Sequence, residues 1–323
     1  MILITVKGIA ALTAVAMLAT FSTQSMATGL ATQGQTALSE AHKFRVEGKF
    51  GDMTNAVRDA LRASANDPAI AKNASKLLRA AALESRRPLP MDWTVPDGMS
   101  NVKLTQSRRE RANGSVGWKL RIQADLVAAG VVQQLQIVHY PNRIILDKQA
   151  GIGEWIEGNW QGQPFFTLTS GSEATSFPEG LYLLNITMTS GTSVLGWFVL
   201  SDLEADSSPI VTSPRSGEVL NSASPEVTWE NWYSSHYRTD ERRSAFLGIR
   251  AVNAQGEWTD AWETFWSNDI PTSARVGDGG NGVPSLVNGD YVAVLNIREA
   301  YRFGDIRMRR EGSRLVPFKV LVE

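Results

Sequence analysis

Cysteine is absent from the 323 residues of this chain. Its absence excludes disulfides, thiol nucleophiles, thiolate metal sites and a lipid anchor on an N-terminal cysteine. Small animal extracellular domains usually carry disulfides, so an exported chain of this composition fits a bacterial periplasm better. Such a chain has to be held together by its hydrophobic cores alone.

Histidine is scarce, and the patterns of common hydrolases are missing. The three histidines, His42, His139 and His236, fall in different segments, and neither Gly-x-Ser-x-Gly nor His-Glu-x-x-His occurs. Nucleophilic catalysis needs a nucleophile, a base and an orienting acid within hydrogen-bond reach. We therefore predict no catalytic residues, no metal site and no cofactor, with His139 on a strand and the other two at the surface.

Carboxylates alone can hydrolyse glycosidic bonds, so acidic residues near tryptophans are the remaining enzymatic alternative. Four carboxylates meet that condition, namely Glu154, Glu157, Asp260 and Glu263. Nothing in the sequence identifies one of them as an acid with a raised pKa. We therefore expect a protein that is not an enzyme.

A basic excess is also missing, because the formal net charge is −1. Phosphate binding needs a basic surface, so no nucleic-acid partner is expected. Arginines do gather near the C-terminus, at Arg298, Arg302, Arg307, Arg309, Arg310 and Arg314. Since Glu299, Asp305 and Glu311 are interleaved with them, we predict a solvated, salt-bridged strand face, with an acidic partner or lipid headgroups as alternatives.

Long apolar runs are confined to the N-terminus. Residues 8–21 are apolar or small, Lys7 precedes them, and Ser25-Met-Ala27 follows. This pattern predicts a signal peptide over residues 1–27 with cleavage after Ala27, because a membrane span needs about 20 apolar residues. The apolar residues before Lys7 leave an uncleaved anchor as the alternative. The mature protein is expected in a bacterial periplasm and not to span the membrane.

Residues 28–87 have the periodicity of α-helices. Apolar residues recur at helical spacing, at Ala37, Ala41, Phe44, Val57, Ala60, Leu61, Ile70, Ala74, Leu77, Leu78 and Ala81. Gly48 and Gly51 are expected to separate the first helix from the second. Asp67 is expected to cap the third helix, with Pro68 in its first position. The segment therefore predicts a three-helix module or a helical hairpin.

Part of this segment resembles a single tetratricopeptide unit. The residues that carry the resemblance are Ala41, Phe44, Gly48, Phe50, Val57, Ala60 and Leu61. It covers about 30 residues, Met53 replaces the usual small residue, and Pro68 comes about three positions late. One repeat cannot bury its own face, and no second copy exists. A plain helical hairpin docked on the next domain is the alternative.

From residue 91 onward, alternation with period two replaces helical spacing. Val116, Trp118, Leu120 and Ile122, for example, alternate with small or polar residues, and turns rich in Gly, Asn, Ser and Pro separate such runs. This pattern is typical of β-sandwiches. The polar segment 204–209 predicts a domain boundary. We therefore expect a mainly β protein with an N-terminal α-helical module and two consecutive sandwiches, over residues 91–203 and 209–323.

The two β segments share a short motif. Gly180 and Tyr182 in the first match Gly289 and Tyr291 in the second, and each pair precedes an alternating strand. Each segment then closes with a similar strand, containing Trp-Phe-Val-Leu at 197–200 and Phe-Lys-Val-Leu at 318–321. The motif resembles the tyrosine corner of immunoglobulin-like and fibronectin type III-like domains. The resemblance implies that the glycine makes the turn while the tyrosine hydroxyl bonds to its backbone.

Tryptophan is abundant, with ten residues in the chain. Trp258, Trp262 and Trp266 are spaced by four, so on a regular strand they share one face. Trp229 and Trp232 are close in sequence. These five are the predicted binding residues for a partner or ligand, and core filling is the alternative. We expect at least one of the first three to be partly exposed, or to pack across a domain boundary beside Trp229 or Trp232.

The glycine-rich segment 277–282 invites a calcium site, but it lacks the ligand spacing of an EF-hand and is predicted as a mobile hairpin loop. Taken together, the sequence predicts a non-enzymatic periplasmic interaction or accessory protein. Its partner would be another envelope protein, such as a membrane sensor or an assembly complex. The alternative is a carbohydrate- or cell-wall-binding protein that uses exposed tryptophans.

Overall fold

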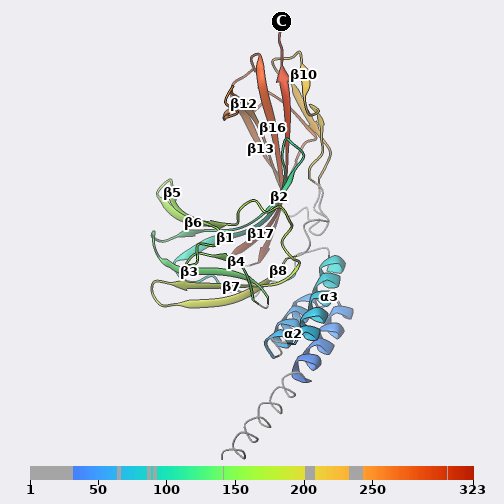
Figure 1. Cartoon of the computed structure of the whole chain (residues 1–323), viewed down its shortest axis with the longest axis vertical. Coiled ribbons are helices and arrows are strands. Elements are labelled where there is room, and N and C mark those ends of the chain that lie inside the picture. The colour runs from blue at the N-terminus through green and yellow to red at the C-terminus, as the bar shows by residue number, and fades with distance from the viewer. Residues whose placement is uncertain are drawn as a thin grey trace, which may run out of the picture. The chain divides into compact units, whose positions relative to one another are not determined.

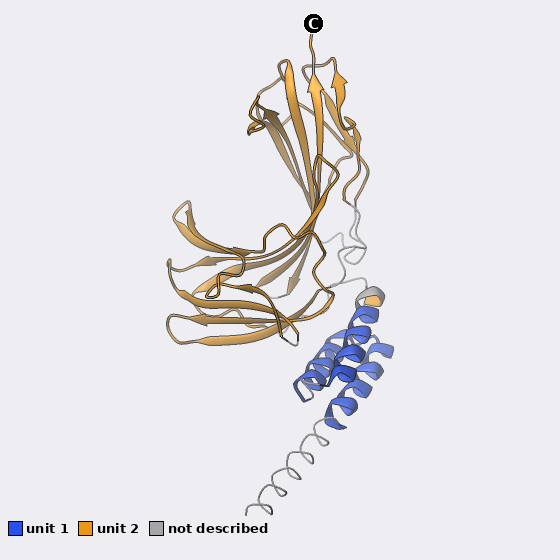
Figure 2. Cartoon of the chain, in the orientation of Figure 1, with its two compact units in different colours: residues 1–81 blue, residues 82–323 orange. Residues whose placement is uncertain are grey.

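The computed structural model describes residues 32–63, 67–85, 89, 93–140, 142–200, 208–232, 243–303 and 305–323. The predicted signal peptide, His236 and most of the predicted boundary at 204–209 lie outside the described residues. The chain divides into two compact units, residues 1–81 and 82–323, which Figure 2 shows in different colours. In the described residues the first unit is helical, and the second is built from strands that follow the end of α3.

Three helices form the N-terminal module, at residues 32–46, α2 (Phe50–Ala63) and α3 (Pro68–Ser85). The turn after the first helix contains Gly48, whose φ of 70° favours glycine. The amide of Lys49 donates to the Phe44 carbonyl, and that of Gly48 donates to the Arg45 carbonyl, both at 2.9 Å. These two bonds satisfy helix-end carbonyls in the manner of a Schellman motif.

The start of α3 is as predicted. Asp67 Oδ1 accepts hydrogen bonds from the amides of Ala69 at 2.8 Å and Ile70 at 3.3 Å, and Pro68 is the first helical residue. The prediction for Gly51 was wrong, because this residue lies inside α2 and only Gly48 separates the helices. None of the helices in the described parts of the chain has the length and apolar character needed to cross a bilayer.

The first sandwich packs two four-stranded sheets. One has the order β1–β2–β6–β5 and the other β4–β3–β7–β8. Their strands are β1 (Met99–Glu110), β2 (Val116–Leu126), β3 (Val132–His139), β4 (Arg143–Asp147), β5 (Glu154–Trp160), β6 (Gln163–Thr169), β7 (Gly180–Met188) and β8 (Ser193–Leu200). In immunoglobulin lettering these are an A-B-E-D sheet and a C′-C-F-G sheet.

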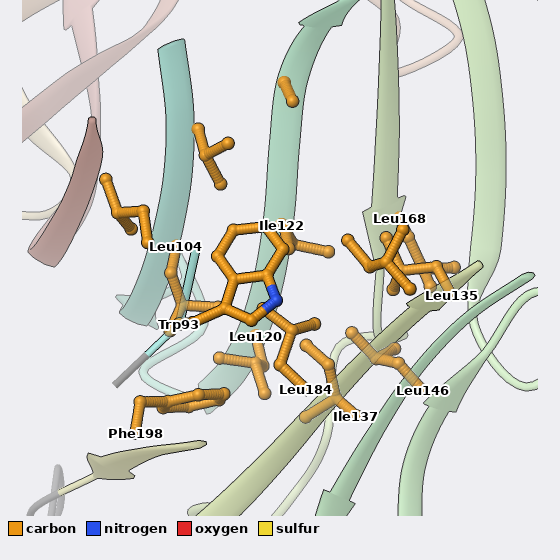
Figure 3. Close-up of a cluster of buried hydrophobic side chains, with 14 of the residues drawn as sticks. Trp93, Leu104, Leu120, Ile122, Leu135, Ile137, Leu146, Leu168, Leu184 and Phe198 are labelled. Atoms are coloured by element: carbon orange, nitrogen blue, oxygen red, sulfur yellow. The ribbon is translucent and has the colours of Figure 1, made fainter. Parts of the chain in front are cut away.

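The core of the first sandwich lies between its sheets (Figure 3). Leu120 and Ile122 of one sheet meet Ile137 and Leu184 of the other, and all four are fully buried. Trp93, from the segment before β1, inserts its indole among them. Burial of such side chains is worth about 1.5–3 kcal/mol each, which holds a sandwich together without disulfides.

The second sandwich repeats the plan with a smaller first sheet. The order β9–β11–β14 corresponds to strands A-B-E, and β13–β12–β16–β17 corresponds to C′-C-F-G. The strands are β9 (Val211–Ser213), β10 (Glu218–Leu220), β11 (Glu226–Trp229), β12 (Arg243–Val252), β13 (Trp258–Ser267), β14 (Ser273–Arg275), β15 (Asn281–Gly282), β16 (Gly289–Phe303) and β17 (Ile306–Val320). The chain is thus mainly β, with consecutive immunoglobulin-like sandwiches after a helical module.

The β16–β17 hairpin joins the two sandwiches into one ten-stranded sheet (Figure 1). Near its base, β16 and β17 belong to the second sandwich. Towards its tip, β17 pairs in parallel with β1, from Val102 opposite Ile306 to Glu110 opposite Arg314. Ile306 therefore lies in the core of the first sandwich, although it comes after the predicted boundary.

A buried polar seam separates the two cores on the inner side of this sheet. Arg310 and Glu299 are both fully buried, and Arg310 Nη1 donates to Gln106 Oε1 at 2.7 Å. Arg243 lies 3.9 Å from Glu299 and donates to the carbonyl of Trp232. A buried charge is tolerated only with such partners, so the seam fixes how the two sandwiches meet.

Candidate functional site

The sequence predicted that the three indoles of strand β13 share one face. In the structure they do not. Ile249 pairs with Trp262, but Arg250 pairs with Asp260, so Ala261 is the extra residue of a β-bulge. A bulge reverses the alternation of side chains along a strand. Trp258 consequently faces away from the core, while Trp262 and Trp266 face into it.

Four of the five predicted binding tryptophans belong to the core of the second sandwich. Trp229, Trp232 and Trp262 are buried, with Trp262 only 1% exposed, and Trp266 packs partly buried against the same core. The rings of Trp229 and Trp266 lie 5.6 Å apart. The burial of these four agrees with core filling, the alternative that the sequence left open.

Trp232 lies at the junction of the sandwiches, where Gly312 makes room for it. A Cβ at Gly312 would lie 2.8 Å from the indole of Trp232 and 3.0 Å from Pro209. These contacts place Trp232 beside the polar seam, where its carbonyl accepts from Arg243. Its role is structural, since it fills the space between the two cores.

The glycine-rich segment 277–282 packs on Trp262, and its last two residues form a strand, which corrects the predicted loop for those two residues. Asn281 and Gly282 form β15 and pair with β13. A Cβ at Gly280 would lie 2.5 Å from Trp262 Nε1, and one at Gly282 would lie 2.2 Å from the Ala261 carbonyl oxygen. The glycines allow backbone to pack directly on the indole and on the bulge. In the described residues, no group of three acidic or histidine side chains is arranged to hold a metal.

Trp258 is the exposed member of the set, at 45%, which confirms the expectation that at least one indole is partly exposed. It lines a groove of about 480 Å³ on the outer face of the second sandwich. We call this the Trp258 groove, and its main apolar walls are Val219, Val252, Trp258, Val292 and Pro317. Val252 lies opposite Trp258 in the ladder.

The groove is apolar and electrically balanced. Val219 is 50% exposed at its rim, and Val292 packs in a small buried cluster beneath it with Val294 and Leu315. Among the described residues of the lining, the only charged side chains are Lys319 and Asp290, whose Nζ and Oδ1 atoms lie 3.3 Å apart. The groove thus offers hydrophobic surface without an unpaired charge.

The carboxylates near the tryptophans are engaged in ordinary interactions. Arg250 forms ion pairs with Asp260 at 2.7 Å and with Glu263 at 3.6 Å. Glu157 Oε1 accepts from the Trp155 indole at 3.2 Å. These three carboxylates thus form ion pairs or hydrogen bonds with neighbouring strand residues, and Glu154 is exposed at the start of β5.

His139 lies on β3, as predicted, and belongs to the corner of the first sandwich. Its ring centroid is 5.0 Å from that of Tyr182, and Nε2 lies 3.3 Å from the Glu179 carbonyl oxygen. Burial lowers the pKa of His139, and the nearby charge of Arg143 lowers it further, although the contact with Glu179 opposes this. His42 is exposed on a helix of the other unit.

The predicted corner residues are equivalent in the two sandwiches. The hydroxyl of Tyr182 donates to the Pro178 carbonyl at 2.5 Å, and that of Tyr291 donates to the Val287 carbonyl at 3.0 Å. Both acceptors lie four residues upstream. Gly180 and Gly289 each begin the strand that carries the tyrosine, but only Gly180 has a positive φ, of 134°.

The C-terminal arginines divide into paired and unpaired groups. Arg298 binds Glu311 at 2.8 Å, and Arg314 binds Glu110 at 2.5 Å, as predicted for a salt-bridged face. Arg310 is instead buried in the seam. Arg307 and Arg309 form no ion pair with any described residue, so the predicted neutralisation of this hairpin is incomplete.

Two exposed features escaped the sequence analysis. Trp160 is 70% exposed at the turn between β5 and β6, where Gln161 and Gly162 have φ of 50° and 86°. A Gln-Gly pair between alternating runs is the signal that could have placed it at a hairpin tip. The second feature is a basic surface that combines residues of β1 and β2 with β17, strands far apart in sequence.

Comparison with known proteins finds no matching family model and no matching curated protein. The fibronectin(III)-like modules of CbhA from Clostridium thermocellum are 10% identical, over 72% of this chain and 94% of that chain, with a TM-score of 0.23. The BSP domain of a biofilm-associated protein is 12% identical, over 68% of this chain and 30% of that chain, with a TM-score of 0.20. A chain from the complex of Dpr2 Ig1–Ig2 with DIP-Theta Ig1–Ig3 is 11% identical, over 72% of this chain and 100% of that chain, with a TM-score of 0.24.

The assignment to immunoglobulin-like sandwiches rests on the strand order of both sandwiches and on the two tyrosine corners.

Proposed function

We propose that this protein is a non-enzymatic interaction protein of the bacterial cell envelope, which binds another envelope protein through the Trp258 groove. The observation that supports it is the exposure of Trp258 beside a groove of aliphatic walls, whereas Trp262 and Trp266 of the same strand face the core. A large ring left in water forgoes about 2–3 kcal/mol of burial, so its exposure points to binding.

The partner chemistry follows from the lining. Aliphatic side chains and proline fit an apolar side chain of a protein segment. A sugar ring would stack on the indole but would also need polar groups for its hydroxyls, and the charged groups of the lining, Asp290 and Lys319, already bind each other. The groove therefore favours a protein partner over the carbohydrate alternative.

Export is part of this proposal and rests on the sequence. Residues 1–27 have the apolar run and the small-residue site of a signal peptide. N-terminal sequencing of the protein from a periplasmic extract should give Thr28 as its first residue. Recovery only from membranes, with Met1 retained, would show an anchor instead.

Site-specific photocrosslinking tests the groove. A benzoylphenylalanine at Val219, which edges the groove, should form an adduct with an envelope protein in intact cells. The same group at Val287, which is also exposed, is the control and should not. Trp258→Ala should abolish the adduct, whereas Trp160→Ala, which removes an exposed indole elsewhere, should leave it.

Equal adducts from both crosslinking positions would reject the groove as the contact site. Loss of glycan-array binding by Trp258→Ala, without any protein adduct in the wild type, would favour the carbohydrate alternative.

A further inference from the structure

The outer face of the ten-stranded sheet gathers cations from three strands. On β1, β2 and β17 the odd-numbered residues point away from the cores, because the even-numbered residues Leu104, Ile122 and Met308 are buried in them. The cations on this side are Lys103, Arg109, Lys119, Arg121, Arg307 and Arg309, and we call them the basic face.

Strand register places like charges directly beside one another. Lys103 of β1 lies opposite Arg307 of β17, which in turn lies opposite Arg302 of β16. One row further on, Arg309 and Arg121 flank Thr105 from either side. Like charges in directly opposed positions destabilise a sheet, so this arrangement opposes folding.

The electrostatics of the face agree with this geometry. Burial lowers the pKa of Lys103, and the nearby charges of Arg309, Arg307 and Arg121 lower it further. Burial, together with Arg298, Arg307 and Arg121, lowers the pKa of Arg309 to about 10. Lys103, Arg121, Arg307 and Arg309 form no ion pair with any described residue.

The carboxylates on this side of the sheet offset these cations only in part, because Asp125 raises the pKa of Lys103 and Glu311 raises that of Arg309, yet both pKa values stay below their ordinary ranges. Glu311 is bound by Arg298 at 2.8 Å and by Asn296 at 2.6 Å, and Asp125 accepts from Asn101 at 2.9 Å. Glu154 lies on the edge strand β5. The cations are therefore gathered on one side of a chain whose net charge is −1.

The basic face is hollowed in two places. One hollow of about 580 Å³ is lined by Arg109, Lys119 and Arg121, with hydroxyl groups of Thr167, Thr169 and Ser313 around them. Glu311, which Arg298 binds, and the apolar side chains of Ile156 and Phe165 complete its lining. A second hollow of about 530 Å³ is lined by Arg298, Arg307 and Arg309, with Ser244 and Ser267. In both hollows the cations outnumber the carboxylates and lie beside neutral hydrogen-bonding groups and a phenylalanine.

The shape and chemistry of this surface select among anionic ligands. A flat bilayer contacts protruding side chains, whereas Lys103 and Arg309 are partly buried in the sheet floor. A peptide usually binds a sheet along a free edge, because the backbone groups of a sheet face are taken up by the ladder and leave the peptide backbone unpaired. A polysaccharide needs no backbone partner, and its hydroxyls can pair with serine and threonine.

We propose that the basic face binds a linear polysaccharide that carries carboxylate groups. The chain would run across β16, β17, β1, β2 and β6, a distance of about 19 Å at the usual strand spacing. Arginines and Lys103 would bind its carboxylates, and the intervening hydroxyl side chains would bind its hydroxyl groups. This site is separate from the Trp258 groove and does not depend on a protein partner there.

Affinity electrophoresis in native gels that contain sodium alginate tests the proposal, with dextran as the neutral polymer. Alginate should retard the wild-type protein, increasingly at low salt, and dextran should not. Arg121→Gln/Arg309→Gln should weaken alginate binding by at least about tenfold, because it removes two charge-assisted contacts.

The matched control is Arg215→Gln/Arg275→Gln, which makes the same charge change at exposed arginines outside the basic face. It should leave alginate binding within about twofold of the wild type. The test double variant should melt no lower than the wild type, because it relieves like-charge repulsion. If it does melt lower, Lys103→Gln alone supplies the smaller change, with the same expectation of weaker binding.

Three results would overturn the proposal. They are no retardation by alginate, equal weakening by both double variants, and binding confined to poly-L-glutamate or to phosphatidylglycerol vesicles. The second would show a general charge effect, and the third would assign the face to an acidic protein or to a membrane.

Discussion

Tyr182 in the first sandwich occupies the position that Tyr291 occupies in the second. Tyr182 lies opposite Phe198 in the ladder, with ring centroids 5.3 Å apart, and Tyr291 lies opposite Phe318 at 5.7 Å. In both cases the hydroxyl bonds to a carbonyl four residues upstream. The internal repeat therefore includes the closing strand as well as the corner.

This equivalence predicts similar costs for removing either hydroxyl. Tyr291→Phe and Tyr182→Phe should each lower the free energy of unfolding by about 1 kcal/mol, because each leaves a carbonyl without its partner. Urea denaturation followed by tryptophan fluorescence measures the change. An unchanged midpoint in either variant would show that water replaces the hydroxyl at that corner.

The bulge at Ala261 predicts opposite outcomes for two tryptophans on one strand. Trp262→Ala should lower the free energy of unfolding by about 3–5 kcal/mol, because it leaves a cavity at a buried site. Trp258→Ala should stay within about 0.5 kcal/mol of the wild type while it weakens binding to the envelope partner. Thermal melting and photocrosslinking on the same samples separate the two effects. Comparable destabilisation by both variants would mean that Trp258 is a packing residue.

Gly280 should resist even the smallest substitution. Gly280→Ala would place a methyl group 2.5 Å from Trp262 Nε1 and should therefore cost about 1–3 kcal/mol. Gly171→Ala is the matched control, because its Cβ would meet only Glu173 at 3.7 Å. Melting temperatures check the difference, and equal values for the two variants would contradict the packing of segment 277–282 on Trp262.

His139 should make the first sandwich sensitive to mild acid. Its folded-state pKa lies below the ordinary value of 6.5, so the unfolded chain takes up the proton first as the pH falls. The stability that neutral His139 contributes is complete above about pH 6.5 and is lost as the pH drops below it. Urea midpoints between pH 7.5 and about 4.5 should fall less steeply in His139→Gln than in the wild type, and His42→Gln should follow the wild type.

The sequence was sufficient for the features that depend on local pattern. The cap at Asp67, the alternation through Leu120 and Ile122, and the paired corners each follow from a few neighbouring residues, and the structure contains all three. The candidate site depended on details that local pattern does not contain. Spacing by four puts three indoles on one face only if the strand is regular, and the extra residue Ala261 breaks that rule.

The basic face was hidden for a different reason. Arginines near the C-terminus were visible as a cluster, but their neighbours Lys103 and Arg121 are about 200 residues away in sequence and adjoin them only through the parallel pairing of β1 with β17. Side-chain alternation gives the face on which a residue lies but not the strand beside it. Counting the acidic residues that lie near these arginines in the sequence therefore overestimated how far the charge of the hairpin is neutralised.

The pairing of β1 with β17 also has a consequence during synthesis. The last strand that the first sandwich supplies for itself ends at Leu200, yet the neighbour of its β1 edge begins at Ile306. A ribosome releases residues in order, so the first sandwich emerges with that edge open and its core without Ile306 and Met308 until β17 has been synthesised. A chain that stops before β17 would expose this edge permanently, and unpaired edges are where chains associate with one another.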